Sequence, residues 1–240
     1  AALAQSMGAG VAGDSSNEAL RGQLADMFTA RGYQVVETPE ECDYAYLHVW
    51  PKQNNIVFLQ SAMPVLELVD GELTDEREVN KNQKKTGRKI PVHTLRGVGR
   101  ISELAEKVHA AGGKVIATCV VSNPWILDRL EPYVDGLTFQ YTVSPVAMNN
   151  ALESQMDVLS GAYNPTGKMS LTMVSSPDVI AITEKEINGV VREICASPND
   201  VPGYDKDPYI DPEILARVRG SSYAYCDADG NYYRSGFGLR

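Results

Sequence analysis

The sequence predicts an α/β fold, in which an open, mostly parallel sheet carries helices on both faces. Segments with helical periodicity alternate with strand-like runs, and most of the connections between them are short. The run 114–121 is apolar on both faces, as a central parallel strand should be. The hydrophobic fraction of 43% and the charged fraction of 22% are ordinary for a soluble globular protein. The chain of 240 residues is long enough for one large domain or two small ones.

The first half of the chain opens with a helix and two strands. Ser15 or Asn17 can cap a helix over residues 18–30, and Gly32 ends it. Strand patterns follow at 33–37 and 44–50. The remaining expected elements are a helix over 99–111, the strand 114–121, a short helix over 124–130, a strand over 136–141, a helix over 144–159, a strand over 171–174 and a helix over 184–194.

A helix-to-strand corner is predicted between residues 157 and 174. Gly161 can take the left-handed conformation that closes a helix. Pro165 cannot continue a helix, and Gly167 permits a second sharp bend. Near the C-terminus, residues 223–233 are typical of a β-hairpin with its turn at Asp229-Gly230.

Two segments depart from this regular pattern. Residues 51–98 form a long irregular insertion, and such insertions after a strand are usually functional or disordered. Residues 1–16 are expected to be a linker or a cut end, and residues 17–240 the α/β domain. Residues 8–13 spell G-x-G-x-x-G, but no β-branched run precedes them, which favours linker. A nucleotide-binding α/β protein is an alternative that rests on this pattern alone.

Composition excludes several classes of partner. The net charge of -9 argues against nucleic acid and against an anionic membrane surface. No apolar run is long enough to span a bilayer. The four cysteines are far apart without a C-x-x-C, so neither a metal site nor a disulfide framework is expected. We expect no cofactor, and a soluble protein for which the cytoplasm is slightly favoured over secretion.

Three phrases resemble glycoside hydrolase family 3. Residues 161–172 (Gly-Ala-Tyr-Asn-Pro-Thr-Gly-Lys-Met-Ser-Leu-Thr) are similar to the family's Asn-Pro-Ser/Thr-Gly-Lys/Arg-Leu-Pro-Val-Thr phrase. Residues 227–239 resemble its closing hairpin and Gly-Phe-Gly-Leu end. Residues 114–127 are similar to its strand followed by a Ser-Gly-Arg-Pro-like turn, with Ser-Asn-Pro-Trp in that place. Together the likeness covers residues 18–240.

The resemblance implies the family's second domain, an α/β sandwich that packs against a (β/α)8 barrel. In such enzymes the barrel supplies an Asp nucleophile and the second domain usually a Glu acid/base. The substrate is a β-linked glycoside or oligosaccharide, hydrolysed with retention of configuration. A barrel of about 250 residues does not fit beside this domain. The isolated chain is therefore expected to be catalytically incomplete and to need a barrel domain in the same or a companion chain.

The candidate site residues lie in and around the insertion. His48 is expected in a strand wall, and His93 is a candidate for substrate binding. Tryptophans at strand ends can stack on a sugar or pack in the core. The acidic run can equally be a solvated face, and the chain can equally be a non-catalytic carbohydrate-binding or regulatory module. The candidates are Glu67, Glu72, Glu76 and Glu78 for the acid/base, and Trp50, Trp125 and His93 for substrate binding.

Overall fold

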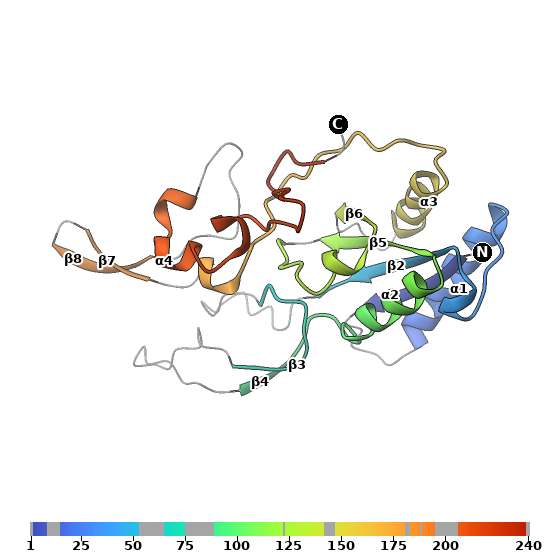
Figure 1. The fold of residues 1–240 in the computed structure, drawn as a ribbon, viewed down its shortest axis with the longest axis horizontal. Helices are drawn as coiled ribbons and strands as arrows, with labels where there is room; N and C mark the ends of the chain where they lie inside the picture. Colours follow the sequence, from blue (N-terminus) through green and yellow to red (C-terminus); the bar gives the residue numbers. More distant parts are fainter. Residues whose placement is uncertain are drawn as a thin grey trace.

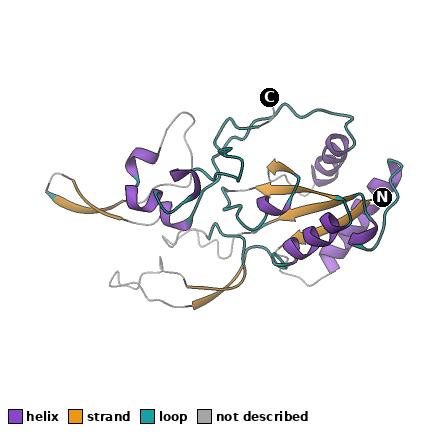
Figure 2. Cartoon of the chain, in the orientation of Figure 1, coloured by secondary structure: helices purple, strands orange, loops and turns teal. Residues whose placement is uncertain are grey.

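The computed structural model describes most of the chain. The described residues are 2–8, 15–52, 65–74, 89–121, 123–141, 147–180, 183–187, 189–194 and 206–238. At its centre is a four-stranded sheet in the order β1-β2-β5-β6, with every neighbouring pair parallel (Figures 1 and 2). The strands are β1 (Ala2–Gly8), β2 (Tyr44–Trp50), β5 (Lys114–Val121) and β6 (Gly136–Tyr141).

One face of this sheet packs against α2 (Arg100–Ala110). Alternate residues of β2, beginning with Ala45 and Leu47, point to this face, because side chains along a strand alternate between its two sides. They share a buried cluster with Ile101 and Val108 of α2. The apolar side chains that recur every 2 residues in the strand and every 3.6 in the helix therefore pack together in one buried cluster.

The other face is covered by α1 (Ser15–Ala30) and α3 (Met148–Leu159). Tyr46, which points away from α2, clusters here with Phe28 of α1 and Met156 of α3. The rings of Phe28 and Tyr46 pack edge to face with their centroids 5.7 Å apart. Helices thus cover both faces of a parallel sheet, and this part of the predicted fold class is confirmed.

Two antiparallel ribbons stand apart from the central sheet in Figure 1. The first pairs β3 (Asp70–Thr74) with β4 (Lys89–His93). The second pairs β7 (Thr183–Ile187) with β8 (Val190–Ile194). The remaining elements are one-turn helices: η1 (Pro39–Glu41), η2 (Glu131–Tyr133), η4 (Pro177–Ile180), η5 (Asp207–Tyr209), α4 (Pro212–Leu215) and η6 (Arg219–Ser221).

The second ribbon contradicts the helix expected over 184–194. Ile187 is paired with Val190, so only Asn188 and Gly189 separate the two strands in the sequence. Asn-Gly is the strongest short hairpin signal because both positions of a type I′ turn need positive φ. Gly189 has a φ of 75°. The Asn-Gly pair therefore predicts this segment better than the helical spacing of its apolar residues does.

Residues 2–8 form a strand where we expected a linker. Ala2 to Gly8 pair with Tyr44 to Trp50 without a break. Their composition is poor in β-branched residues, so the strand depends on its pairing partner more than on local preference. The G-x-G-x-x-G pattern begins at the end of this strand, and residues 9–14 lie outside the described residues. In dinucleotide-binding folds the strand before that pattern is central, whereas β1 is at an edge of the described sheet.

Three further strand expectations are met only by isolated bridges. In the segment 33–37 only Val35 forms a bridge. In 171–174 the bridge joins Val174 to Ala224, and in the expected C-terminal hairpin it joins Cys226 to Tyr232. The segment 124–130 is a turn region and not the short helix that we expected.

The corner after α3 is half confirmed. Gly161 has a φ of 75° and ends the helix as predicted. Gly167 has no positive φ and lies in a stretch without a turn or bend, so the sharp bend expected there is wrong.

Candidate functional site

The carboxyl ends of β2 and β5 meet at one edge of the sheet, where open α/β folds usually bind ligands. Trp50 is the last residue of β2. The segment that follows β5 is joined to the segment 65–69 of the insertion. Ile126 N donates to Leu66 O at 2.9 Å, and Glu67 forms a parallel bridge with Ile126. Part of the insertion therefore returns to the edge where it was expected to act.

Thr94 fixes the backbone of Glu67 at this edge. Its buried hydroxyl donates to Glu67 O at 2.6 Å and accepts from Val69 N at 2.8 Å. The Glu67 side chain is half-buried, and its Oε2 accepts from Leu66 N at 3.1 Å. Of the four acid/base candidates, Glu67 is thus held at the carboxyl edge. Its backbone carbonyl accepts from Thr94, and its carboxylate accepts from the backbone N–H of Leu66.

Asp128 brings a second carboxyl group to the same place. The residue is exposed, yet desolvation of its carboxyl by the surrounding protein raises its pKa. The neighbouring Arg129 opposes this rise, and repulsion from Glu67 adds to it. The sequence analysis does not include Asp128 among its candidates, because all four acid/base candidates lie in the insertion. An acidic residue soon after the apolar end of a central strand was the available signal.

Trp50 is tied into the same arrangement. Its ring is half-buried, and Lys52 Nζ lies 5.1 Å from the ring centroid. Lys52 N donates to Thr94 O at 2.8 Å, so one threonine connects the end of β2 with the backbone of Glu67. The edge therefore combines an aromatic ring, a cation and two carboxyl groups.

Trp125 is a core residue, which corrects its assignment as a sugar-stacking residue. Its side chain is fully buried in the α2 face of the sheet. Its backbone N–H points to the sulfur of Met173 at 3.4 Å. A ring enclosed in this way has no face left for a ligand, so core packing was the correct alternative.

The β3–β4 ribbon carries two of the other candidates. His93 is paired with Asp70 at the base of the β3–β4 ribbon. The backbone of Glu72 lies opposite the backbone of Pro91 in the same ribbon. Glu76 and Glu78 lie outside the described residues. His48 is in a strand wall, as predicted, and is fully buried.

A cluster of one carboxyl group and two tyrosines lies close to Asp128. The carboxyl group is that of Glu131 on η2, and the tyrosines are Tyr225 and Tyr233. Tyr225 Oη donates to Glu131 Oε2 at 2.9 Å. Burial raises the pKa of Glu131, and the Tyr225 hydrogen bond partly offsets that rise. Burial and the charge of Glu131 also raise the pKa of Tyr225 and of Tyr233. No spacing pattern in the sequence predicts this cluster, since Glu131 and Tyr225 are separated by more than ninety residues.

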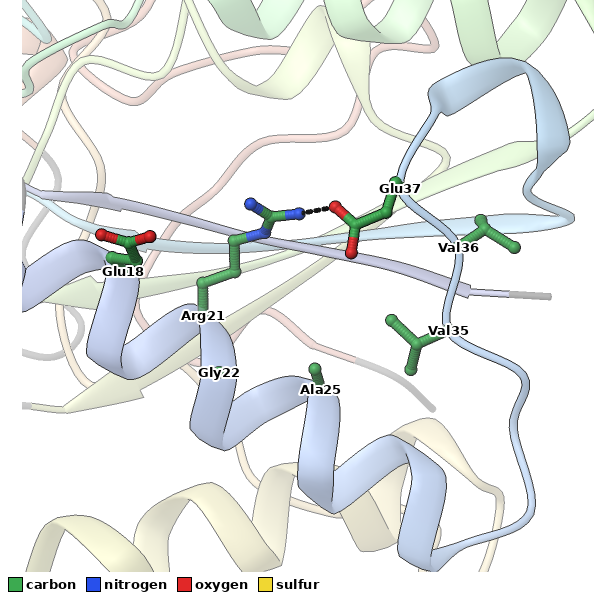
Figure 3. A pocket seen from close by; sticks show the side chains of 7 residues that line it. All are labelled: Glu18, Arg21, Gly22, Ala25, Val35, Val36 and Glu37. Carbon is green, nitrogen blue, oxygen red and sulfur yellow. Dashed lines mark hydrogen bonds and ion pairs between the residues drawn. The ribbon is translucent and has the colours of Figure 1, made fainter.

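Two hollows lie away from this edge. The first, of about 180 Å³, lies between α1 and the segment 35–37, where Arg21 and Glu37 form an ion pair across it (Figure 3). It is smaller than the usual volume of small-molecule sites. The second is a groove of about 700 Å³ beside β6, lined mainly by apolar side chains.

Two absences apply to the described part of the chain. No group of three or more His, Cys, Asp or Glu side chains is placed to hold a metal ion there. No helix among the same residues is long and apolar enough to cross a membrane.

A comparison with protein-family models finds no match for the chain, and a comparison with curated protein sequences finds none either. The likeness to glycoside hydrolase family 3 therefore rests on the three phrases alone.

Proposed function

We propose that this chain is the second domain of a retaining β-glycoside hydrolase of the family 3 type, with its sugar site at the carboxyl edge of the sheet. The observation that supports this best is Asp128, an exposed carboxyl group whose pKa is raised and which lies in the field of Glu67. In this proposal a (β/α)8 barrel domain supplies the nucleophile.

The chemistry of glycoside cleavage explains why such a carboxyl group matters. A general acid must still hold its proton near neutral pH and must reach the leaving oxygen. Desolvation and a neighbouring negative charge both favour the protonated form. The pKa of Asp128 is shifted in the direction that a general acid needs, whereas Glu67 Oε2 already accepts a backbone N–H. We therefore assign the acid/base role to Asp128 and a supporting electrostatic role to Glu67.

Trp50 is assigned to the sugar ring. The flat apolar face of a pyranose stacks on aromatic side chains, and the polar rim then needs charged or polar neighbours. Lys52 and the two carboxyl groups provide them at this edge.

Calorimetric titration with cellobiose tests the sugar site. We expect saturable binding that is lost in Trp50→Ala and kept in Tyr163→Ala, since Tyr163 is an exposed aromatic residue beyond α3. The isolated chain should not hydrolyse 4-nitrophenyl β-glucoside, because double displacement needs a nucleophile that, in this proposal, the barrel domain supplies. Absence of binding to any β-glucoside would refute the proposal, and turnover by the isolated chain would refute its need for a barrel.

A cationic iminosugar separates the catalytic domain from a non-catalytic module. Its charge mimics the charge that develops during glycoside cleavage. Asp128→Asn should weaken 1-deoxynojirimycin about tenfold or more, because a charge-assisted hydrogen bond is lost, and should leave cellobiose binding nearly unchanged. If the parent chain and Asp128→Asn bind the iminosugar with equal affinity, a non-catalytic carbohydrate-binding module is favoured instead.

A further inference from the structure

The groove beside β6 is separate from the carboxyl edge. β6 is the last strand of the described sheet, with α3 and the C-terminal segment beside it (Figure 1). None of Trp50, Glu67 and Asp128 lines the groove. Its volume of about 700 Å³ and its mainly apolar lining are typical of a small-molecule site.

One wall of the groove is a fixed array of aromatic rings. Tyr233 packs edge to face on Phe139 at 6.2 Å and on Tyr225 at 5.5 Å. Phe237 lies against Tyr233 with a centroid distance of 4.9 Å. Rings held by several neighbours lose little freedom when a ligand stacks on them. This wall is therefore suited to a flat apolar or aromatic body.

Gln155 of α3 adds a polar side chain to this mainly apolar lining. Its Oε1 accepts from Thr118 Oγ1 at 3.2 Å and from Thr138 Oγ1 at 3.3 Å. Tyr46 Oη donates in turn to Thr118 Oγ1 at 2.9 Å. The carbonyl end of the Gln155 amide is thus occupied, and its NH2 group has no hydrogen-bond partner among the described residues. Since Gln155 lines the groove, the network orients a donor for a ligand.

The charges of the lining residues limit the class of ligand that can bind in the groove. All the lining residues are described, and none of them is acidic, so no carboxylate is available to attract a cation. The charged lining residue is Lys168, whose ammonium group donates to Gly238 O at 3.0 Å. A neutral molecule with an acceptor atom fits these surroundings best.

We propose that the groove binds a neutral, flat, largely apolar molecule that stacks along Tyr233 and Phe237 and presents a carbonyl oxygen to the Gln155 amide. This site goes beyond the proposed glycosidase function and does not depend on it. The Tyr46–Thr118–Thr138 network acts as a positioning device for the Gln155 donor.

Two probes of nearly the same shape test the proposal. Coumarin has a fused planar ring and a carbonyl, whereas naphthalene has the ring alone. We expect the full chain to bind coumarin saturably, measured by chemical-shift titration, at concentrations up to about 1 mM. Gln155→Leu should weaken coumarin about threefold to tenfold and leave naphthalene unchanged, because a single hydrogen bond is removed. Ser154→Ala, an exposed neighbour on the same helix, is the matched control and should change neither.

A second variant tests the place of binding without disturbing the network. Val158→Trp puts a large ring into the groove from the half-exposed face of α3 and should abolish binding of both probes. Melting temperatures of all variants show whether each is folded. The proposal is overturned if coumarin does not saturate, if Val158→Trp binds as well as the parent, or if Gln155→Leu weakens both probes equally. Because Trp50→Ala should leave coumarin binding intact, failure of the sugar site and failure of the groove are distinguishable.

Discussion

Nδ1 of His93 lies 2.6 Å from Oδ1 of Asp70, across the first residue pair of the β3–β4 ribbon. The other oxygen, Oδ2, accepts from Gly97 N at 2.8 Å. The Gly97 N–H bond, with help from His93, lowers the pKa of Asp70 below its ordinary value. His93 thus serves to close the base of a ribbon, which is a structural task.

The first prediction concerns this pair. Asp70→Asn and His93→Ala should each lower the free energy of unfolding by about 0.5 to 1 kcal/mol, because the pair is only partly shielded from solvent. Since the folded-state pKa of Asp70 is depressed, its contribution is present above the unfolded pKa and is lost as the pH falls through the folded value. Urea unfolding near neutral pH and in acid measures both effects. If His93→Ala weakens cellobiose binding while the melting temperature holds, His93 belongs to the sugar site after all.

The second prediction concerns His48. Both ring nitrogens are buried, neither has a hydrogen-bond partner among the described residues, and burial lowers the pKa of His48 to about 4. Below an unfolded pKa of about 6.5 the unfolded chain takes up a proton that the folded chain refuses. Stability should therefore fall between about pH 6.5 and pH 4, by on the order of 3 kcal/mol.

His48→Leu should remove this pH dependence. Near neutral pH it should be as stable as the parent or more stable, by about 1 kcal/mol, because two unsatisfied buried nitrogens disappear. Urea unfolding at several pH values provides the test, and Tyr44→Leu, an exposed change in the same strand, is the control. A variant that keeps the parental slope between about pH 6.5 and 4.5 would show that His48 is not the titrating group.

The third prediction compares two glycines of one corner. Gly161→Ala should cost about 1 kcal/mol, because a side chain is unfavourable at its φ of 75°. A Cβ on Gly167 meets nothing within 4 Å, and its φ is not positive, so Gly167→Ala should be neutral or slightly stabilising. Thermal unfolding of the two variants side by side checks this. Equal losses in both would mean that the corner depends on Gly167 as well.

Part of the candidate site could be predicted from the sequence, because it depends on local order. Trp50 ends a strand with a clear apolar pattern, and the insertion that holds Glu67 follows it directly. The place of Asp128 could not be predicted. It depends on the Ile126–Leu66 hydrogen bond, which joins residues sixty positions apart. Trp125 was ambiguous for a similar reason, since only the packing around it decides whether its ring is covered.

The sequence by itself determined the elements whose pattern is long and periodic: α1, α2, α3, β2, β5 and β6. It also determined the helix end at Gly161, because that conformation is a property of one residue type. Tertiary structure decided the rest. β1 exists through its register with β2, and the carboxyl groups of Glu67 and Asp128 influence each other only after the insertion returns to β5. Local patterns report the free energy of short segments, whereas pairing, burial and pKa depend on neighbours that the fold brings together.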